Sequence, residues 1–371
     1  MFVPVNEPLL NGNEKKYLIE CIDTGWISSD GPFIKKFEDN LSHYFGRKYA
    51  IAVSNGTVAI DIAIDALDLQ EGDEVIMPTF TIISCITGIL RKRCIPVFVD
   101  QDSETWNMDV SQIESKITPR TKAIMVVHIY GLPVDMNPVL DIAKKYNLKV
   151  IEDAAEMHGQ EYNGKKCGSF GDISTVSFYP NKHITTGEGG MIFTDDDKLA
   201  ERCRSLRNLC FIPEQRFIHH ELGYNARMSN LQAAVGLAQL ERIEQSILKK
   251  RQIGHFYQDK LKDIDTIHLP VAEAEYAKNI YWVFGIVLKN ANLSQTQSLM
   301  AELSKRGIGT RPFFWCLHEQ PVLKKFGITV TDSFPVAENL SRCGFYIPSG
   351  LAITEEQMEY VVNNLTQILV K

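Results

Sequence analysis

Residues 49–68 read YAIAVSNGTVAIDIAIDALD, and the hydrophobic pattern of this stretch changes at a turn. YAIAVS is short, apolar and rich in residues that favour strands, whereas TVAIDIAIDALD is typical of a helix. Between them, Ser54, Asn55, Gly56 and Thr57 form a strand-to-helix turn. Its N–H groups, hydroxyls and positive helix-dipole end suit an anion, although a plain helix cap without a ligand explains the same residues.

The alternation of strand-like and helix-like runs continues from this stretch to about Thr194. The further strand-like runs are DEVIMP, IPVFVD, KAIMVVHIY, KVIED, STVSFY and GGMIFT, and helical patterns such as MNPVLDIAKKYN lie between several of them. Strands buried on both faces and joined by crossover helices form a mostly parallel α/β sheet with helices on both faces. Such sheets bind ligands beyond the carboxyl ends of their strands, so the loops there are the place to look for a site.

The length of 371 residues suggests more than one ordinary core. Apolar residues recur at helical spacing over residues 229–264, interrupted only by Gly236 and Gly254, which predicts a long helical connection. After it, NIYWVFGIVL, GIGTRPFF and ITEEQMEYVVNNLTQILV indicate a smaller α+β unit. We therefore expect a large α/β domain over residues 1–245 and a small C-terminal domain over residues 246–371, with the N-terminal segment free to pack on the small one.

Composition narrows the functional classes. The formal charge of -7 is spread along the chain, which argues against a nucleic-acid surface. No apolar run approaches the roughly 18 residues of a membrane helix, and the N-terminus lacks the features of a signal peptide, so we expect a cytosolic protein without membrane contact. The eight cysteines contain no CxxC pair, which predicts buried free thiols and neither a metal site nor disulfides.

Two more loops are expected at the carboxyl edge of the sheet. The strand KVIED brings Glu152 and Asp153 there, although pairing with an arginine or capping a helix is about as common for such acids. His158, a little further on, is expected to be a satisfied core or surface histidine. The segment SFYPNKHITTGEGGM places Lys182 beside His183. Loop lysines usually face solvent, and TTGEGGM also fits a hairpin turn into the next strand.

Taken together, the three loops supply the parts of a site for pyridoxal 5'-phosphate. The helix N-terminus suits the phosphate, and a strand-end acid keeps the pyridine nitrogen protonated so that the ring can accept electrons. A lysine forms the Schiff base with the aldehyde, which a histidine cannot do.

At this point the motifs are recognisable. The chain resembles the pyridoxal-phosphate-dependent nucleotide-sugar aminotransferases of the DegT/DnrJ/EryC1/StrS family, and among them the GDP-perosamine synthases. The resemblance runs nearly end to end, through WISSDGPFIKKFE, SNGTVAI, GDEVIMPTFT, TPRTKAIMVVHIYG, VIEDAAE, SFYPNKHITTGEGGM, GYNARMSNLQAAVGLAQLE and TRPFF. It implies fold type I of these aminotransferases.

The resemblance also implies roles for individual residues. Lys182 would carry the cofactor, Asp153 would pair with its pyridine nitrogen and Glu156 would lie near its ring hydroxyl. The phosphate would be bound by Gly56, Thr57 and Ser177, with Asn225 reaching it from the second subunit of a homodimer. The implied substrate contacts are Trp26, Ser28, Ser29 and Arg311, which could instead be a packed aromatic, two turn hydroxyls and a surface ion pair.

Three positions refine the resemblance. Ile82 stands where relatives commonly place an aromatic residue on the cofactor ring, so the stacking contribution of roughly 0.5 to 1.5 kcal/mol is lost and cofactor affinity could be lower. Ala226 removes bulk beside Asn225, since relatives often read GYNYRM here. A branch of the family replaces the lysine by histidine and dehydrates the sugar at C3; here Lys182 keeps the cofactor position and His183 is the additional residue.

The implied reaction is transamination. L-glutamate would donate an amino group to C4 of a nucleotide-linked 4-keto-6-deoxy sugar, giving a 4-amino-4,6-dideoxy sugar for surface polysaccharides such as the O-antigen of lipopolysaccharide. Three alternatives stay open: a UDP- or dTDP-linked 4-keto or 3-keto sugar, a C3 dehydratase, and a scaffold with a dead site. Intact Lys182 and Asp153 speak against the last two.

Overall fold

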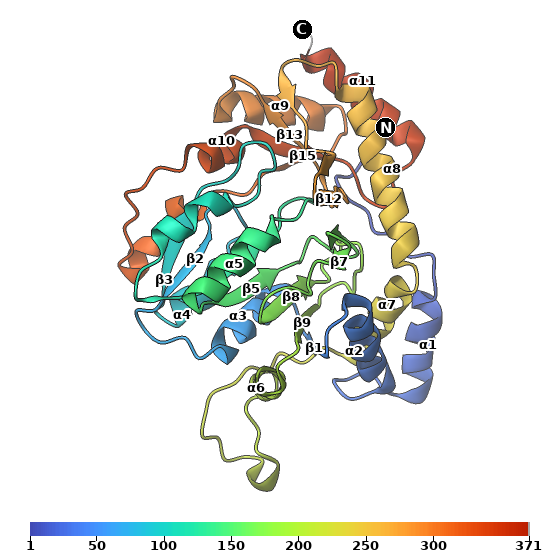
Figure 1. Cartoon of the computed structure of the whole chain (residues 1–371). Helices are drawn as coiled ribbons and strands as arrows, with labels where there is room; N and C mark the ends of the chain where they lie inside the picture. The colour runs from blue at the N-terminus through green and yellow to red at the C-terminus, as the bar shows by residue number, and fades with distance from the viewer. Residues whose placement is uncertain (370–371) are drawn as a thin grey trace.

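A seven-stranded sheet forms the centre of the larger part of the molecule in the computed structural model, which describes residues 1–369 (Figure 1). The strand order is β1-β9-β8-β5-β4-β2-β3. These strands are β1 (Tyr49–Val53), β2 (Glu74–Pro78), β3 (Ile95–Val99), β4 (Thr121–Val127), β5 (Lys149–Asp153), β8 (Ile173–Ser177) and β9 (Gly190–Thr194). β9 runs antiparallel to both its neighbours, and the other pairings are parallel, so the predicted mostly parallel sheet is confirmed.

Helices cover both faces of this sheet because its strands are apolar on both sides. In β4, Ala123 and Met125 belong to one hydrophobic cluster, whereas Ile124 and Val126 belong to the other. This alternation is the two-residue period of a strand. The first cluster includes side chains of α3 (Gly56–Ala66), α4 (Ser84–Arg91) and α6 (Asp197–Arg207). The second includes side chains of α2 (Pro32–Phe45), α5 (Met136–Tyr146) and α7 (Asn230–Leu240).

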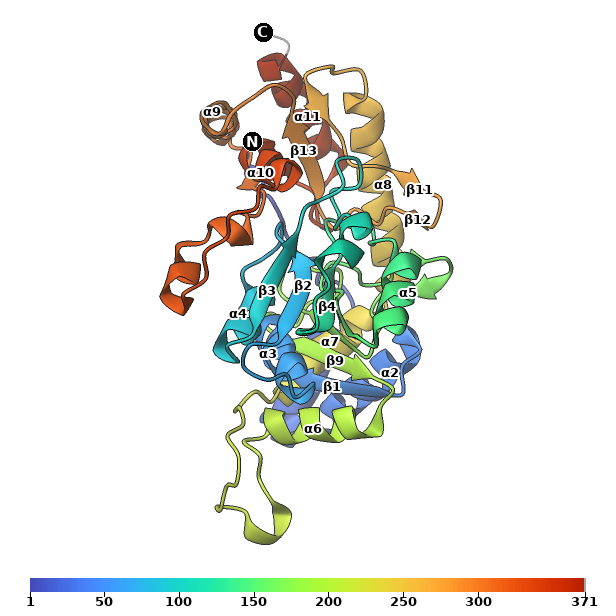
Figure 2. The same cartoon turned by 60° about the vertical axis from the view of Figure 1, so that its left-hand side comes forward.

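A second, four-stranded sheet lies at one end of the molecule together with both termini (Figure 2). Its strands, in the order β10-β13-β15-β14, are β10 (Ile267–His268), β13 (Phe284–Leu288), β15 (Gly344–Ile347) and β14 (Arg311–Pro312). The helices of this end are α8 (Ile243–Leu261), α9 (Leu293–Lys305), α10 (Pro335–Cys343) and α11 (Glu355–Leu369). The N-terminal segment reaches this unit, since Val3 N–H donates to Gly307 O at 2.8 Å and Val3 O accepts from Gly309 N–H at 2.8 Å.

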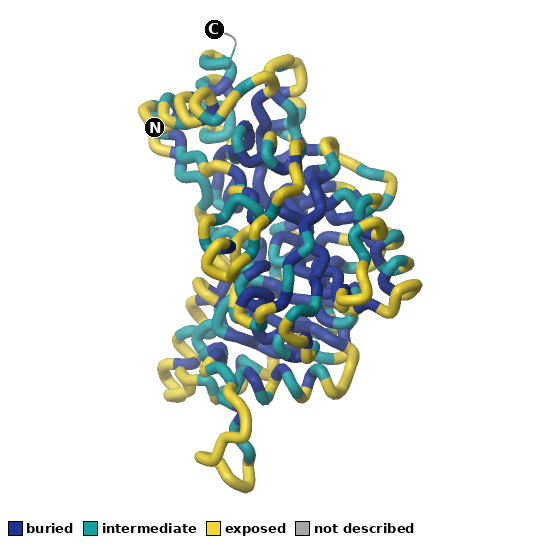
Figure 3. The backbone as a smooth tube through the Cα atoms, turned by 90° about the vertical axis from the view of Figure 1, so that its left-hand side faces the viewer, coloured by how far each residue is buried: buried dark blue, intermediate teal, exposed yellow. Residues whose placement is uncertain are grey.

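The remaining elements are short. They are α1 (Glu14–Thr24), the hairpins β6 (Glu161–Tyr162) with β7 (Lys165–Lys166) and β11 (Glu273–Ala274) with β12 (Ala277–Lys278), and the 3-10 turns at Val110–Gln112, Glu114–Lys116, Pro213–Gln215, Leu317–Glu319 and Pro321–Phe326. The segment after α6 projects from the body and is largely exposed (Figure 3). Phe217 and Leu222 in it are 81% and 93% exposed.

The predicted helical stretch over residues 229–264 is two helices, and its interruption was placed wrongly. α7 ends at Leu240 and α8 begins at Ile243, whereas Gly236 and Gly254 lie inside the helices. Both glycines permit close packing. A Cβ on Gly236 would lie 2.4 Å from Cζ of Phe37, and one on Gly254 would lie 2.2 Å from Cδ2 of Tyr281. The domain boundary that we propose, between residues 245 and 246, falls within the first turn of α8.

Two further observations concern the chain as described. All eight cysteines are buried free thiols, as predicted. Among residues 1–369, no helix is both long enough and apolar enough to cross a bilayer, and no cluster of three or more His, Cys, Asp or Glu side chains is arranged to hold a metal ion.

Candidate active site

A cavity of about 700 Å³ opens at the carboxyl edge of the large sheet, where β1, β5 and β8 end. The three predicted loops meet in it, and small-unit residues close one side. Its lining includes Asn55, Gly56, Thr57, Ile82, Ser84, Asp153, Glu156, Ser177, Lys182, Trp282, Phe314 and Tyr346. Smaller hollows of about 450 to 530 Å³ lie elsewhere on the described part of the chain, and none of these four is lined by Lys182 or Asp153.

One wall of the cavity is a cradle made by two helix N-termini. Asn55 caps α3 by accepting the Val58 N–H at 2.9 Å. The hydroxyl of Thr57 lies 2.8 Å from that of Ser84, the first residue of α4. Gly56 has no room for a side chain, because a Cβ there would lie 2.6 Å from Cβ of Ser177. Two positive dipole ends and three hydroxyls at one place suit a phosphate.

The acidic wall is formed by two buried carboxylates. Asp153, at the end of β5, accepts from Ala155 N–H at 3.0 Å and from the Cys85 thiol at 3.2 Å. Glu156 accepts from Tyr130 N–H at 2.7 Å. Burial raises the pKa of both groups, that of Glu156 to about 8. A cation placed against Asp153, such as a protonated ring nitrogen, would lower its pKa again.

Glu152, the other acid of KVIED, has a structural role. It is fully buried, pairs with Nε2 of His128 at 3.0 Å and accepts from the N–H groups of Gly168 and Phe170. Successive residues of a strand point to opposite faces, which explains why Glu152 and its neighbour Asp153 have different surroundings.

Lys182 brings a buried amine into the cavity. Its Nζ lies 3.9 Å from Oε1 of Glu156 and 3.6 Å from the centre of the Trp282 ring. Burial lowers the pKa of Lys182 although Glu156 and Asp153 oppose this shift. Since the pKa of Glu156 rises while that of Lys182 falls, burial outweighs the mutual attraction of the pair, whose geometry at 3.9 Å is loose. The amine is thereby more easily deprotonated than that of an exposed lysine.

The two histidines beside the site belong to the core. Nδ1 of His183 lies 3.1 Å from the carbonyl of His158, whose own Nδ1 accepts from Ile184 N–H at 3.1 Å. Both rings are 1% exposed. Burial lowers the pKa of both, that of His158 to about 3, so both are neutral at pH 7. Of the two locations expected for His158, core or surface, the structure shows the core, and its Nε2 has no hydrogen-bond partner among residues 1–369.

Other predicted site residues lie outside this cavity on the same chain. Asn225 pairs through its backbone with Asn208 in the projecting segment. Arg311 is exposed in β14, opposite Tyr346 of the cavity lining. The segment with Trp26, Ser28 and Ser29 lies against the start of α7, where Asn230 N–H donates to Ser28 O at 2.6 Å. Trp26 is 50% exposed. These residues could complete the site only from its rim or from a second chain.

The model of the DegT/DnrJ/EryC1/StrS aminotransferase family matches residues 8–366 of the chain. The chain belongs to this family. Among its relatives, a GDP-perosamine synthase of Escherichia coli O157:H7 is 42% identical over 99% of the chain and 98% of that protein. Another, from Caulobacter vibrioides, is 41% identical over 99% and 98%. A Bacillus subtilis relative, named provisionally as a pyridoxal phosphate-dependent aminotransferase, is 33% identical over 98% and 95%.

Solved structures of aminotransferases share the fold. The aminotransferase TlmJ from Streptoalloteichus hindustanus superposes with a TM-score of 0.92 at 26% identity, covering 100% of this chain and 99% of that one. The predicted fold type I of this aminotransferase family is therefore confirmed, as is the resemblance read from the motifs.

The residues of the cavity fit the cofactor of the family. The cavity has a cradle that a Cβ at Gly56 would fill, a buried acid at the end of β5 and a lysine whose side chain is only 9% exposed. These groups match a phosphate, a protonated pyridine nitrogen and an aldehyde. Ile82 lies in the cavity lining and is 42% exposed. It presents an aliphatic surface at the position where relatives commonly have an aromatic residue.

Sequence reasoning missed several residues of the cavity. Ser84 could have been found, because PTFTIIS ends a strand segment and starts a helix, as SNGT does. Cys85 follows Ser84 in the chain. Its thiol reaches Asp153 only because α4 packs beside the carboxyl end of β5. Trp282 and Tyr346 come from the small unit, and nothing in their local sequence signals that the chain returns to this cavity.

Proposed function

We propose that this aminotransferase transfers the amino group of L-glutamate to C4 of a GDP-linked 4-keto-6-deoxy sugar, giving GDP-perosamine or a close analogue. Pyridoxal 5'-phosphate is the cofactor. The observation that carries the proposal is the buried amine of Lys182 in one cavity with Asp153, Glu156 and a phosphate cradle. The two GDP-perosamine synthases similar over nearly the whole chain support the choice of substrate.

In this proposal the cradle and the two acids hold the cofactor. Gly56, Thr57 and Ser177 bind its phosphate, with Ser84 beside Thr57. Asp153 would keep the ring nitrogen protonated, and Glu156 and Ile82, which line the same cavity, would contact the ring. When bound, pyridoxal phosphate supplies an electrophilic carbon and an electron sink for the bond that breaks at the amino-bearing carbon.

Lys182 has two tasks in this scheme. Its Nζ is the covalent attachment point, and the lowered pKa makes the neutral, nucleophilic amine accessible at a lower pH than in an exposed lysine. Once free, the same Nζ would take up the proton that leaves the amino-bearing carbon and later release it, and in the second half-reaction it would do so in reverse. His158 and His183 stay neutral and buried, so neither adds a charge to these steps.

The remaining predicted residues are assigned to substrate and partner. We propose that two chains form a dimer in which Asn225 of one chain reaches the phosphate of the other. The projecting segment after α6, with Phe217 and Leu222 exposed, supports an apolar contact between subunits. Trp26, Ser28, Ser29 and Arg311 are proposed contacts of the nucleotide sugar at the rim.

We further propose that the enzyme acts in the cytoplasm, where its product is used to build a surface polysaccharide such as the O-antigen. The absence of a bilayer-crossing helix in residues 1–369 is compatible with this location.

The competing assignments differ in substrate or in reaction. A UDP- or dTDP-linked 4-keto or 3-keto sugar would use the same residues, whereas a C3 dehydratase would not need an amine at position 182. The deciding experiment offers GDP-, UDP- and dTDP-linked 4-keto-6-deoxy hexoses with glutamate and measures 2-oxoglutarate and amino-sugar formation. We expect amination at C4 of the GDP-linked sugar. Preference for another nucleotide, or 3-deoxygenation without amino transfer, would contradict the proposal.

A further inference from the structure

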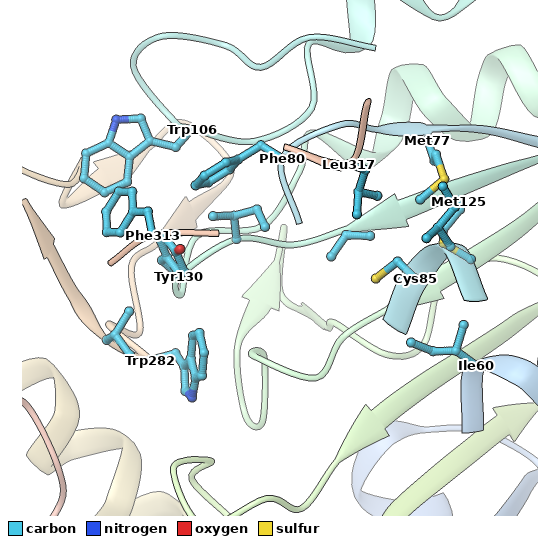
Figure 4. Close-up of a cluster of buried hydrophobic side chains, with 14 of the residues drawn as sticks. Ile60, Met77, Phe80, Cys85, Trp106, Met125, Tyr130, Trp282, Phe313 and Leu317 are labelled. Carbon is cyan, nitrogen blue, oxygen red and sulfur yellow. The ribbon is translucent and has the colours of Figure 1, made fainter. Parts of the chain in front are cut away.

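Trp282 is the nearest aromatic neighbour of the buried amine. It lies just before β13, in the small unit, and its ring is 4% exposed. Nζ of Lys182 sits 3.6 Å from the ring centre, within the range of a cation–π contact. Figure 4 shows Trp282 beside Tyr130 and Phe313, in an aromatic cluster that continues to Phe80 and Trp106.

Trp282 is held both through its ring and through its backbone. Its Nε1–H donates to the carbonyl of Asn181 at 2.8 Å, so the ring is tied to the loop that carries Lys182. The backbone carbonyl of Trp282 accepts from Nζ of Lys250 at 2.7 Å. Lys250 is 2% exposed and also donates to Ser349 O at 2.6 Å. The ring is therefore tied to the loop of Lys182, and the backbone that carries the ring is tied to α8.

The backbone before Trp282 is held in an unfavourable conformation. Tyr281 has φ of +51°, in the left-handed region that side chains other than glycine rarely adopt. Its N–H donates to Oδ1 of Asn279 at 2.7 Å. Gly131, with φ of +114°, allows the close approach, because a Cβ there would lie 2.7 Å from N of Trp282. Strain of this kind persists where the surroundings over-determine it, and it gathers at functional sites.

A ring held in this way affects the charge on the amine. The face of an indole attracts an ammonium, and the attraction grows when water is excluded. The same ring excludes water, and burial works in the opposite direction by favouring the neutral amine. The ring therefore limits how far burial destabilises the protonated form of Lys182.

We infer that Trp282 is a positioning residue for Lys182: its indole face holds the protonated amine in place during proton transfer, Asn181 fixes the ring, and Lys250 fixes the backbone that carries it. This inference rests on the proposed role of Lys182 as the amine that carries the cofactor. Trp282 itself donates no proton and forms no bond to the substrate.

Other charged and titratable groups also act on the amine and stay unchanged in the test. The titratable groups on the surrounding elements that interact electrostatically with Lys182 are Glu156, Asp153, Cys85, His158, His183 and Lys250. Since none of them is replaced, a change in the titration of Lys182 on replacing Trp282 reports on the ring.

The test measures the rate at which cofactor-free protein takes up pyridoxal phosphate, followed by visible absorbance from pH 6 to pH 10. Uptake requires the neutral amine, so its pH midpoint follows the titration of Lys182. Loss of the ring should lower the midpoint. In Trp282→Leu we expect a shift of about 0.4 to 1.5 pH units downward, the span of a buried cation–π contact expressed as pKa. Trp282→Phe keeps a ring and should shift the midpoint less.

Two controls make the test decisive. Trp282→Met, a second apolar variant with a longer and more flexible side chain, replaces Trp282→Leu if that variant does not fold. The melting temperature of each variant reports any loss of packing. A structural role alone would lower the melting temperature and the uptake rate at every pH with an unchanged midpoint, and an unchanged or raised midpoint in the non-aromatic variants would overturn the inference.

The wild type separates this inference from the proposed function. Wild-type protein that takes up no pyridoxal phosphate would contradict the proposed function and the inference that rests on it. Wild-type protein that takes up the cofactor, with no downward shift in the Trp282 variants, would contradict the inference alone.

Discussion

Oε1 of Glu156 lies 3.9 Å from Nζ of Lys182, and burial drives both groups toward their neutral forms. The consequence can be measured on the cofactor-free protein. The folded pKa of Glu156, about 8, lies above its ordinary value of 4.5. Between these two values the folded state binds more protons than the unfolded state, so Glu156 makes stability fall as pH rises through this window.

Glu156→Gln should remove that dependence. The amide oxygen can still accept from Tyr130 N–H, so the local hydrogen bond is kept. We expect the melting temperature of the cofactor-free variant to exceed that of the wild type at pH 8, on the order of 2–4 °C for each kcal/mol recovered. The difference should vanish well below pH 4.5, where the wild-type carboxyl is protonated in both states. A variant that is less stable than the wild type at pH 8 would contradict this description of the pair.

Lys182→Ala should stop amino transfer. Loss of proton transfer alone costs about 10²- to 10⁴-fold in kcat, and loss of the covalent attachment adds to that. The matched control is His183→Asn, which keeps a donor toward the carbonyl of His158. That variant should lose stability through imperfect packing but keep activity within a few-fold per folded molecule. Equal loss of activity in both variants would remove the distinction between the two neighbours.

Ile82→Phe should tighten cofactor binding. Ile82 lines the cavity and is 42% exposed, so there is room for a larger side chain. A stacked aromatic ring contributes roughly 0.5 to 1.5 kcal/mol, equivalent to about a 2- to 12-fold lower Kd for pyridoxal phosphate. Equilibrium dialysis measures this directly, with Ile83→Phe as the control because Ile83 is similarly exposed but does not line the cavity. Weaker binding in Ile82→Phe would place the cofactor ring elsewhere.

Asn225 and Lys182 should act on one site from two chains. If so, mixing inactive Lys182→Ala with impaired Asn225→Ala subunits creates mixed dimers in which one of the two sites is intact. We expect activity to recover to about a quarter of the wild-type value, since random exchange makes half of the dimers mixed and each has one intact site. No recovery after subunit exchange, shown by native mass spectrometry, would contradict a site shared between subunits.

The sequence predicted the large sheet well because its information is local. Each strand is a short apolar run, and alternate residues such as Ala123 and Ile124 face different helix layers. The turn at Gly56 was equally readable, since a helix cap and its glycine are neighbours in the chain. The break between α7 and α8 was not, because Gly236 and Gly254 serve contacts with Phe37 and Tyr281 that only the folded chain creates.

The residues of the candidate site that lie in local motifs could be predicted, whereas those that come from the small unit could not. Lys182, Asp153 and Glu156 follow directly after strands or in motif loops, and the topology brings them together. Trp282 lies 100 residues after Lys182 and reaches it only because the small unit folds back over the sheet edge. Long-range contacts of this kind depend on the packing of whole units, which no short motif encodes.

The central claim, that Lys182 is the amine that carries the cofactor, has a direct test. Protein loaded with pyridoxal phosphate is reduced with borohydride, digested, and analysed by mass spectrometry to find the modified lysine. Lys250 is an internal control, because it is also buried, with its pKa lowered to about 7, yet it bonds only to backbone carbonyls. The cofactor mass should appear on the peptide containing Lys182. Its appearance on Lys250 or another lysine, or on none, would contradict the claim.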